Sequence, residues 1–194
     1  MHMNEQLYFY AAAAAAGLVL YFILAGRRSW LRAKPSHGSA MTRFGENIRL
    51  RDLFRLAVLL EEEGLAFYQK MAEKVSDPAV KELCLELAGE EVKHRDLLQG
   101  QLDSWRPLAV HAAQWPAFLE KVKKEGFFGA PPGEGASEKE MAAYAIRQEI
   151  KSAEFYGLFE QAFPDAWKRV EIHNLVAQER AHEARLRAAY PGAV

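Results

Sequence analysis

Cysteine is nearly absent from this sequence, since Cys84 is the only one among 194 residues. A single cysteine forms no disulfide within the chain and no CxxC pair for a rubredoxin-type iron or a zinc knuckle. Any metal site must therefore be built from Glu, Asp and His side chains. A charge excess is lacking too, because the formal net charge is −1 at pH 7. Nucleic-acid-binding proteins usually carry a basic excess on one face, so we expect no nucleic-acid partner.

Charged residues are missing from the stretch between Gln6 and Gly26. Its 21 residues would span about 31 Å as a helix, close to the roughly 30 Å hydrocarbon core of a bilayer. No Lys or Arg precedes it, and a basic cluster follows it at Arg27, Arg28, Arg32 and Lys34. A cleaved signal peptide would carry its positive charge ahead of a shorter apolar run. We therefore predict a transmembrane anchor with its basic flank over residues 1–32. The positive-inside rule then predicts a single-pass protein of the cell (inner) membrane with its C-terminal domain in the cytoplasm.

An internal repeat dominates the rest of the chain. Residues 33–47 are rich in Pro, Gly and Ser and are expected to form a linker. Residues 48–194, which we expect to form one domain, match themselves without gaps at an offset of 88 residues. The matched pairs are Glu61 and Glu149, Phe67 and Phe155, Tyr68 and Tyr156, Asp77 and Asp165, Leu87 and Leu175, Glu91 and Glu179, His94 and His182, and Leu98 and Leu186.

Each half of the repeat has the pattern of a helical hairpin. Apolar residues recur at three- and four-residue steps, and no stretch alternates as a strand would. Asp77 and Pro78 predict a helix start, with Asp as the cap and Pro at the first helical position. The hairpins are expected over 48–102 and 138–190. Residues 103–137 are too many for a tight loop and suit the long crossover of a ferritin-like bundle. We therefore predict an all-α fold, a ferritin-like four-helix bundle preceded by one N-terminal transmembrane helix.

Glutamates lie at matched distances from the turn of each hairpin. Glu61 lies 16 residues before Asp77, and Glu91 lies 14 residues after it. In an antiparallel hairpin the heights of these two glutamates differ by only about 3 Å. Glu91 and His94 are three residues apart and share a helix face. The same relations hold in the second half for Glu149, Glu179 and His182. Two hairpins packed face to face thus bring four carboxylates and two imidazoles to one level of the core.

Six ionisable side chains at one level of a core need partners, because burying isolated charges is very costly. Two divalent cations would balance the four negative charges of the carboxylates. Oxygen ligands with one His for each metal suit iron or manganese. Di-iron and di-manganese bundles use this combination of side chains. We therefore expect two metal ions in the bundle, either iron, manganese or a mixed pair.

The segments FYQKMAEK and LAGEEVKH, with their second-half counterparts, resemble the rubrerythrin-type ferritin-like di-iron proteins. The resemblance covers residues 50–102 and 138–190. It implies two iron ions held by Glu61, Glu91, His94, Glu149, Glu179 and His182. It also implies that Tyr68 and Tyr156 lie near the metals, where each could donate a hydrogen bond to a carboxylate of the opposite hairpin. No catalytic residue separate from the metal ligands is expected.

Two departures from the rubrerythrin pattern bear on the chemistry. Ser152 stands where rubrerythrins usually carry an extra carboxylate, which argues against their peroxide-reducing, metal-shifting reaction. The cysteines of a rubredoxin centre are missing, so electrons must come from iron itself or from another protein. Glu62, Glu63 and Glu90 neighbour the predicted ligands and are interpreted as solvated residues, since each successive residue is turned by about 100° around the helix.

Three functions are compatible with these features. The first is a membrane-anchored di-iron protein that reacts with O2 or peroxide, as a ferroxidase or a peroxide scavenger. The second is a di-iron oxygenase or oxidase that acts on a membrane quinone or lipid. The third is a non-catalytic interaction subunit of a membrane complex. The electron donor is unidentified, and a homodimer is expected only by analogy with related bundles.

Overall fold

The computed structural model describes residues 16–21, 34–44, 48–104, 115–124, 126–165 and 173–194. Most of the predicted anchor, 1–32, lies outside these ranges. Residues 16–21 are helical, and the side chains of Leu18, Val19 and Leu20 are exposed. Within the described ranges, no helix has the length and apolar character needed to cross a bilayer.

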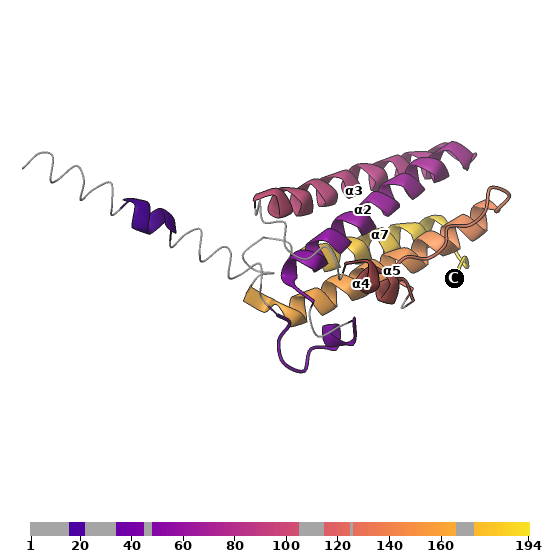
Figure 1. Ribbon diagram of the computed structural model, residues 1–194. Helices are drawn as coiled ribbons and strands as arrows, with labels where there is room; N and C mark the ends of the chain where they lie inside the picture. Colours follow the sequence, from indigo (N-terminus) through magenta and orange to yellow (C-terminus); the bar gives the residue numbers. More distant parts are fainter. Residues whose placement is uncertain (1–15, 22–33, 45–47, 105–114, 125, 166–172) are drawn as a thin grey trace, which may run out of the picture.

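Four long helices lie side by side (Figure 1). They are α2 (Leu50–Lys74), α3 (Pro78–Ser104), α5 (Glu138–Ala162) and α7 (Leu175–Ala189). Helix α2 packs against α3 and α5 against α7, and contacts between α2 and α5 and between α3 and α7 join the two hairpins. The described part of the chain contains no strand. The prediction of an all-α bundle is confirmed for these residues.

Side-chain caps set where two of the long helices begin. The Asp77 carboxylate accepts hydrogen bonds from the backbone N–H groups of Ala79 and Val80, at 2.8 and 3.3 Å, and Pro78 is the first residue of α3. The predicted start of this helix is thus confirmed. At the start of α5, Ser137 and Glu140 each accept a hydrogen bond from the other's backbone N–H. Such a reciprocal cap satisfies two N–H groups that the helix itself leaves free.

The connecting segments pack against the bundle. The backbone N–H and the hydroxyl of Ser36 both donate to the carbonyl oxygen of Ala162, each at 2.9 Å. The short 3-10 helix η1 (Ala40–Phe44) follows and buries Met41. Helix α4 (Trp115–Lys124) lies within the predicted crossover. The linker and the crossover thus contribute to the core as well as joining its parts.

The two hairpins are less alike than the repeat suggests. By its offset, α7 should correspond to the whole of α3, but α7 begins only at Leu175. A turn at His173 and Asn174 comes directly before it, and residues 166–172 lie outside the described ranges. The part of α7 that matches residues 87–101 of α3 is nevertheless helical, and this part carries the predicted ligands.

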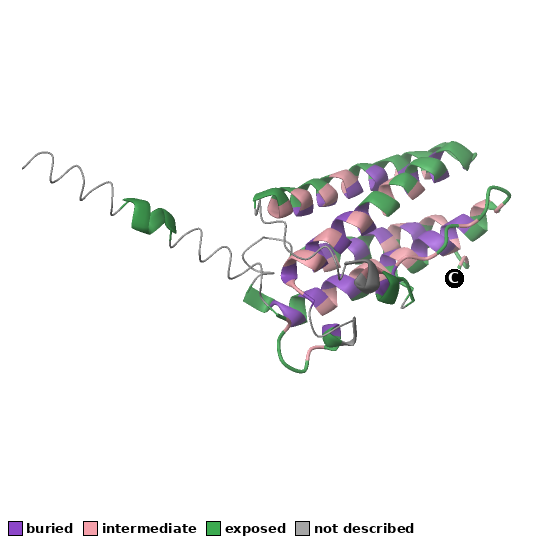
Figure 2. Cartoon of the chain, viewed as in Figure 1, coloured by how far each residue is buried: buried purple, intermediate pink, exposed green. Residues whose placement is uncertain are grey.

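The buried residues of the long helices lie on the faces that these helices turn toward one another (Figure 2). One apolar group lies around Phe54 and Phe159, whose rings meet edge to face at 5.2 Å. Other apolar groups, including Leu87 and Met71, lie further along α2 and α3. Between them lies a polar layer. In the described residues, the buried charged and polar side chains are Glu61, Glu91, His94, Glu149, Glu179 and His182, exposed by only 1 to 4%.

Candidate metal centre

The structure brings all six predicted ligands to one level of the bundle. Each long helix contributes at least one of them, so the layer depends on the packing of all four. Helices α2 and α5 each supply one glutamate, and α3 and α7 each supply a glutamate and a histidine three residues later. In chain order these residues are Glu61, Glu91, His94, Glu149, Glu179 and His182.

The ligand atoms form two overlapping groups. One consists of Glu61, Glu91, His94 and Glu179, and the other of Glu91, Glu149, Glu179 and His182. Within each group, the ligand atoms all lie within 4.8 Å of one another. The α3 and α7 glutamates belong to both groups, whereas the α2 and α5 glutamates belong to one each. Two cations, one held by each group, would therefore have the carboxylates of Glu91 and Glu179 in common.

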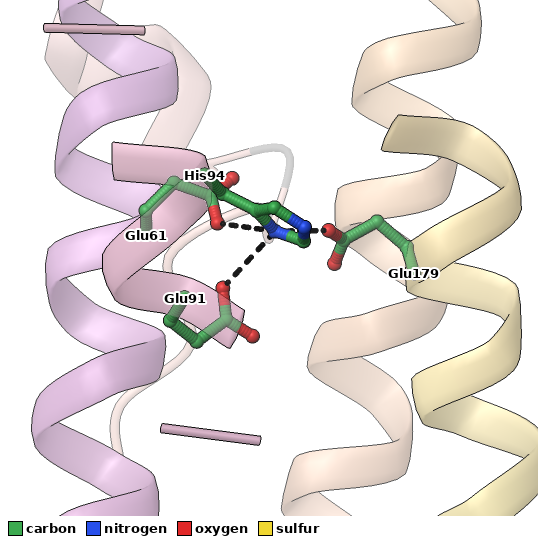
Figure 3. Close-up of side chains that lie close together, drawn as sticks. All are labelled: Glu61, Glu91, His94 and Glu179. Atoms are coloured by element: carbon green, nitrogen blue, oxygen red, sulfur yellow. Dashed lines mark hydrogen bonds and ion pairs between the residues drawn. The ribbon is translucent and has the colours of Figure 1, made fainter. Parts of the chain in front are cut away.

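His94 points into the first group (Figure 3). Its Nδ1 atom lies 3.2 Å from Glu61 Oε2, 3.4 Å from Glu179 Oε1 and 3.7 Å from Glu91 Oε2. These three carboxylates come from three different helices. The Nδ1 atom thus lies where a cation held by the group would need a nitrogen ligand.

His182 occupies the equivalent place in the second group. Its Nδ1 atom lies 3.4 Å from Glu91 Oε1 and 3.4 Å from Glu149 Oε2. The His94 and His182 rings are stacked, with centroids 5.6 Å apart and an angle of 14° between their planes. Both histidines therefore direct Nδ1 toward the carboxylates and Nε2 away from them.

Without cations, the buried layer holds protons. Burial and the neighbouring Glu91 carboxylate raise the pKa of Glu61 to about 8. Burial and the charges of Glu149 and Glu61 raise the pKa of Glu179 well above its ordinary value. Burial alone would lower the pKa of His182, but Glu149 and Glu91 outweigh it and raise this pKa to about 11. Protons thus reduce the charge repulsion in the metal-free layer.

Hydrogen bonding within the layer is incomplete, which tests whether cations fit there. Glu149 Oε2, Glu179 Oε1 and His182 Nδ1 are buried and make no hydrogen bond. Buried polar atoms in proteins are nearly always satisfied, so these three need an explanation. All three belong to the two ligand groups. Carboxylate oxygens with one imidazole nitrogen in each group form a donor set for iron or manganese, and the residues present fit a pair of such ions.

Two tyrosines contact the two glutamates that each belong to only one of the ligand groups. The Tyr68 hydroxyl donates to Glu149 Oε1, and the Tyr156 hydroxyl donates to Glu61 Oε1. Each bond is buried and joins one hairpin to the other, as the sequence suggested. Burial and the nearby carboxylates raise the pKa of both tyrosines well above the ordinary value, so both stay protonated as donors.

Glu90, which was predicted to be solvated, is only partly exposed and contacts two residues of α7. Its Oε2 atom lies 2.7 Å from Nε2 of His182, and its Oε1 atom lies 3.0 Å from Nη1 of Arg185. Burial works against the charge of Glu90, but Arg185 and His182 outweigh it and lower the pKa. In the other hairpin, Gln178 Oε1 forms a hydrogen bond with His94 Nε2.

These two contacts are made from equivalent positions of the repeat. Glu90 and Gln178 are 88 residues apart, and each directly precedes the glutamate of an ExxH motif. The two residues differ in type, so a search for identical residues in the two halves does not pair them. Of the other two glutamates interpreted as solvated, both are exposed, and Glu63 lines a pocket.

A small pocket borders the polar layer and is lined by residues of α2, α3, α5 and α7. Its volume is about 30 Å³. Its lining includes the buried ligand candidates Glu91, Glu149 and Glu179 and the more exposed Glu63 and Ser152. The full lining is Leu60, Glu63, Gly64, Phe67, Tyr68, Glu91, Tyr144, Ala145, Gln148, Glu149, Ser152 and Glu179. Gly64 is part of this lining, and a Cβ there would lie 3.3 Å from Cδ of Glu91.

One comparison with known proteins identifies a family. The sequence model described as Rubrerythrin matches residues 52–190, which include all four long helices from Asp52 onward and all six ligand candidates. The comparisons with curated proteins and with solved structures gave no match.

Proposed function

Because this chain belongs to the rubrerythrin family, we propose that it is a di-iron oxidoreductase that reacts with O2 or hydrogen peroxide. The observation that carries the proposal is the pair of buried ligand groups that share Glu91 and Glu179. Glu61 and His94 would complete one iron site, and Glu149 and His182 the other. A bound iron pair supplies electrons to such oxidants by cycling between Fe(II) and Fe(III).

The chain's own residues prepare the site for this reaction. Tyr68 and Tyr156 hold Glu149 and Glu61 in place through buried hydrogen bonds, which reduces the reorganisation needed when ions bind. Ligand exposures of 1 to 4% keep bulk water away from the cluster. Protons held by the metal-free carboxylates and histidines leave when cations arrive, since the ligand forms are deprotonated.

The pocket favours a small oxidant. A volume of about 30 Å³ has room for one or two water-sized molecules. Dioxygen and hydrogen peroxide are of this size, whereas a quinone ring or a lipid chain is far larger. The size of the pocket therefore supports the first of the three functions over an oxygenase that acts on a membrane quinone or lipid.

Ser152 bears on the choice between a ferroxidase and a peroxide scavenger. It lines the pocket beside Glu149, at the position where rubrerythrins usually have a further carboxylate. A serine hydroxyl carries no negative charge and would not hold a metal ion as a carboxylate would. This supports oxidation of Fe(II) as the main reaction, with O2 and hydrogen peroxide as alternative electron acceptors.

We further propose that residues 6–26 anchor this domain to the cell membrane with the bundle in the cytoplasm, on the strength of the uncharged run and the basic cluster behind it. An electron donor or a larger membrane complex would then meet the bundle at the membrane surface. Cell fractionation tests the anchor. Recovery of the full chain in the membrane fraction after a high-salt wash supports it, and recovery in the wash contradicts it.

The function is tested with the full chain in detergent. Metal-free protein is titrated with Fe(II) without oxygen, and bound iron is counted. We expect about two iron ions for each chain, followed by rapid oxidation when O2 or hydrogen peroxide is added. Glu61→Gln should lower the iron count, while the control Glu62→Gln, its exposed neighbour, should not. A wild-type chain that binds no iron would contradict the proposed function and favour a non-catalytic subunit.

A further inference from the structure

The two ligand groups differ in the residue that contacts the Nε2 atom of their histidine. His182 Nε2 faces a carboxylate oxygen of Glu90 at 2.7 Å. His94 Nε2 faces the amide oxygen of Gln178. The repeat makes these two partners equivalent in position, at an offset of 88 residues. The cluster is therefore nearly symmetric in its ligands but asymmetric in the residues that support the two imidazoles.

The orientation of each imidazole ring determines which nitrogen could bind a metal and which one forms the hydrogen bond with Glu90 or Gln178. Nδ1 of both histidines faces the glutamates, so a bound metal would take the Nδ1 lone pair. The ring proton then resides on Nε2, which donates to Glu90 in one case and to Gln178 in the other. A carboxylate is a stronger acceptor than an amide, and the hydrogen bond pulls the proton away from the ring. The ring of His182 therefore becomes the better electron donor to its metal.

The guanidinium group of Arg185 holds the Glu90 carboxylate in place beside His182. Arg185 Nη1 lies 3.0 and 3.2 Å from the two oxygens of Glu90, and Nη2 lies 3.5 Å from Glu86. The repeat places Leu97 at the position equivalent to Arg185, so the other half has no such cation there. The two repeat positions that correspond to Glu90 and Arg185 thus carry the uncharged residues Gln178 and Leu97.

We propose that Glu90 and Gln178 make the two metal positions unequal, so that the position of His182 binds a divalent cation more tightly than the position of His94. Both are positioning residues, since neither belongs to a ligand group. The inference rests on the proposed di-metal function. Loss of a hydrogen-bond partner behind a metal-binding histidine typically lowers affinity about 10- to 100-fold, and we expect the two positions to differ by about 10-fold.

The test is a titration of the metal-free full chain in detergent with Co(II), followed by calorimetry and by visible absorption. Wild-type protein should bind two ions in two steps with affinities about 10-fold apart. Glu149→Gln removes a ligand found only in the His182 group and should abolish the tight step. Glu61→Gln removes a ligand found only in the His94 group and should abolish the weak step.

Two single substitutions, each of which gives one histidine the hydrogen-bond partner of the other, are the decisive variants. Glu90→Gln should bring the two affinities together by weakening the tight step, and Gln178→Glu should bring them together by strengthening the weak step. Glu86→Gln is the matched control, because Glu86 contacts Arg185 but makes no contact with a histidine. It should keep both steps as in the wild type. Opposite changes in affinity from the two exchanges are not expected from a general loss of folding, which would weaken both steps.

The outcomes separate this inference from the proposed function. Two Co(II) ions bound with equal affinity by the wild type would overturn the inequality and leave the di-metal centre intact. Two unequal steps that are unchanged by Glu90→Gln would show that another feature causes the difference, which also overturns the inference. Binding of no ion by the wild type would overturn both.

Discussion

Tyr68 of α2 donates a buried hydrogen bond to Glu149 of α5, and the bond from Tyr156 to Glu61 repeats it with the two helices exchanged. Each tyrosine lies seven residues after the glutamate of its own helix, about two turns further on. The bonds therefore cross between the hairpins at both ends of the ligand layer. They join the two halves of the bundle and orient the two glutamates that belong to a single group each.

Removal of one of these hydroxyls should affect both stability and metal binding. In Tyr68→Phe, Glu149 Oε1 loses its buried donor, which typically costs about 1–3 kcal/mol. We expect the free energy of unfolding of the metal-free protein, measured in urea, to fall by this amount. Co(II) binding at the position of His182 should weaken as well, because Glu149 is held less firmly.

Tyr144→Phe is the matched control for Tyr68→Phe. The Tyr144 hydroxyl donates to the carbonyl oxygen of Gly129 at 3.0 Å and not to a ligand carboxylate, although Tyr144 also lines the pocket. This variant should lose stability while keeping the wild-type Co(II) affinities. Equal effects of the two substitutions on metal affinity would show that the Tyr68 hydrogen bond has no special role at the metal centre.

The shared glutamates should matter more for metal binding than the glutamates that belong to one group. Glu91→Gln or Glu179→Gln removes a negative charge and a ligand from both groups at once, and we expect neither ion to be retained at micromolar Co(II). Glu61→Gln should leave one ion bound, because the other group keeps all four of its ligands. Metal counting after gel filtration measures the difference. One ion retained by Glu91→Gln would argue against a bridging role.

The wall of the pocket at Gly64 should control access of the oxidant. In Gly64→Ala the new Cβ would lie 3.3 Å from Cδ of Glu91, inside the pocket wall. Alanine is the better helix former, by about 1 kcal/mol, but the 3.3 Å contact requires the Glu91 side chain to shift. The two effects oppose each other, so we expect little change in thermal stability. The rate at which hydrogen peroxide oxidises the Fe(II)-loaded protein should fall several-fold in stopped-flow absorption.

Gly89→Ala separates this effect from helix propensity. Gly89 lies on α3, and a Cβ there would meet nothing within 4 Å. The variant should become slightly more stable and should keep the wild-type oxidation rate. An equal rate in Gly64→Ala and the wild type would mean that the oxidant reaches the metals by another route.

Cys84 should be unreactive in the folded protein. Its side chain is fully buried, and burial together with the nearby Glu138 raises the pKa of the thiol to about 11. At pH 8 the thiol is therefore protonated, and only the thiolate reacts readily. Labelling with iodoacetamide at pH 8 should be at least ten times slower in the native protein than in urea. Equally rapid labelling of both would contradict the buried position.

Much of the site could be predicted from the sequence because it is encoded by regular spacing. Glu61 and Glu91 flank Asp77 at nearly equal distances, and an antiparallel hairpin turns equal distances into equal heights. The repeat then supplies Glu149 and Glu179 in the same way. Spacing along helices is a local property, so it can be read without knowledge of how the hairpins are oriented.

The partners of these side chains could not be predicted with the same ease. The angular position of Glu90 on α3 predicts a solvated residue, yet its carboxylate contacts His182 of α7. A long side chain at the edge of a buried helix face contacts whichever helix packs beside it. The packing of Ser36 on the end of α5 is a similar case, because no local pattern in the linker indicates it.

The sequence alone determined that the chain forms two related helical hairpins and that six ionisable residues share their inner faces, because helix periodicity and the repeat are properties of residue order. Only the tertiary structure decided which oxygens and nitrogens meet, that Glu91 and Glu179 are shared, and that His182 and His94 have different partners. These depend on how the hairpins pack against each other, since a hydrogen bond requires atoms within about 3 Å and residue order sets no distance between separate hairpins.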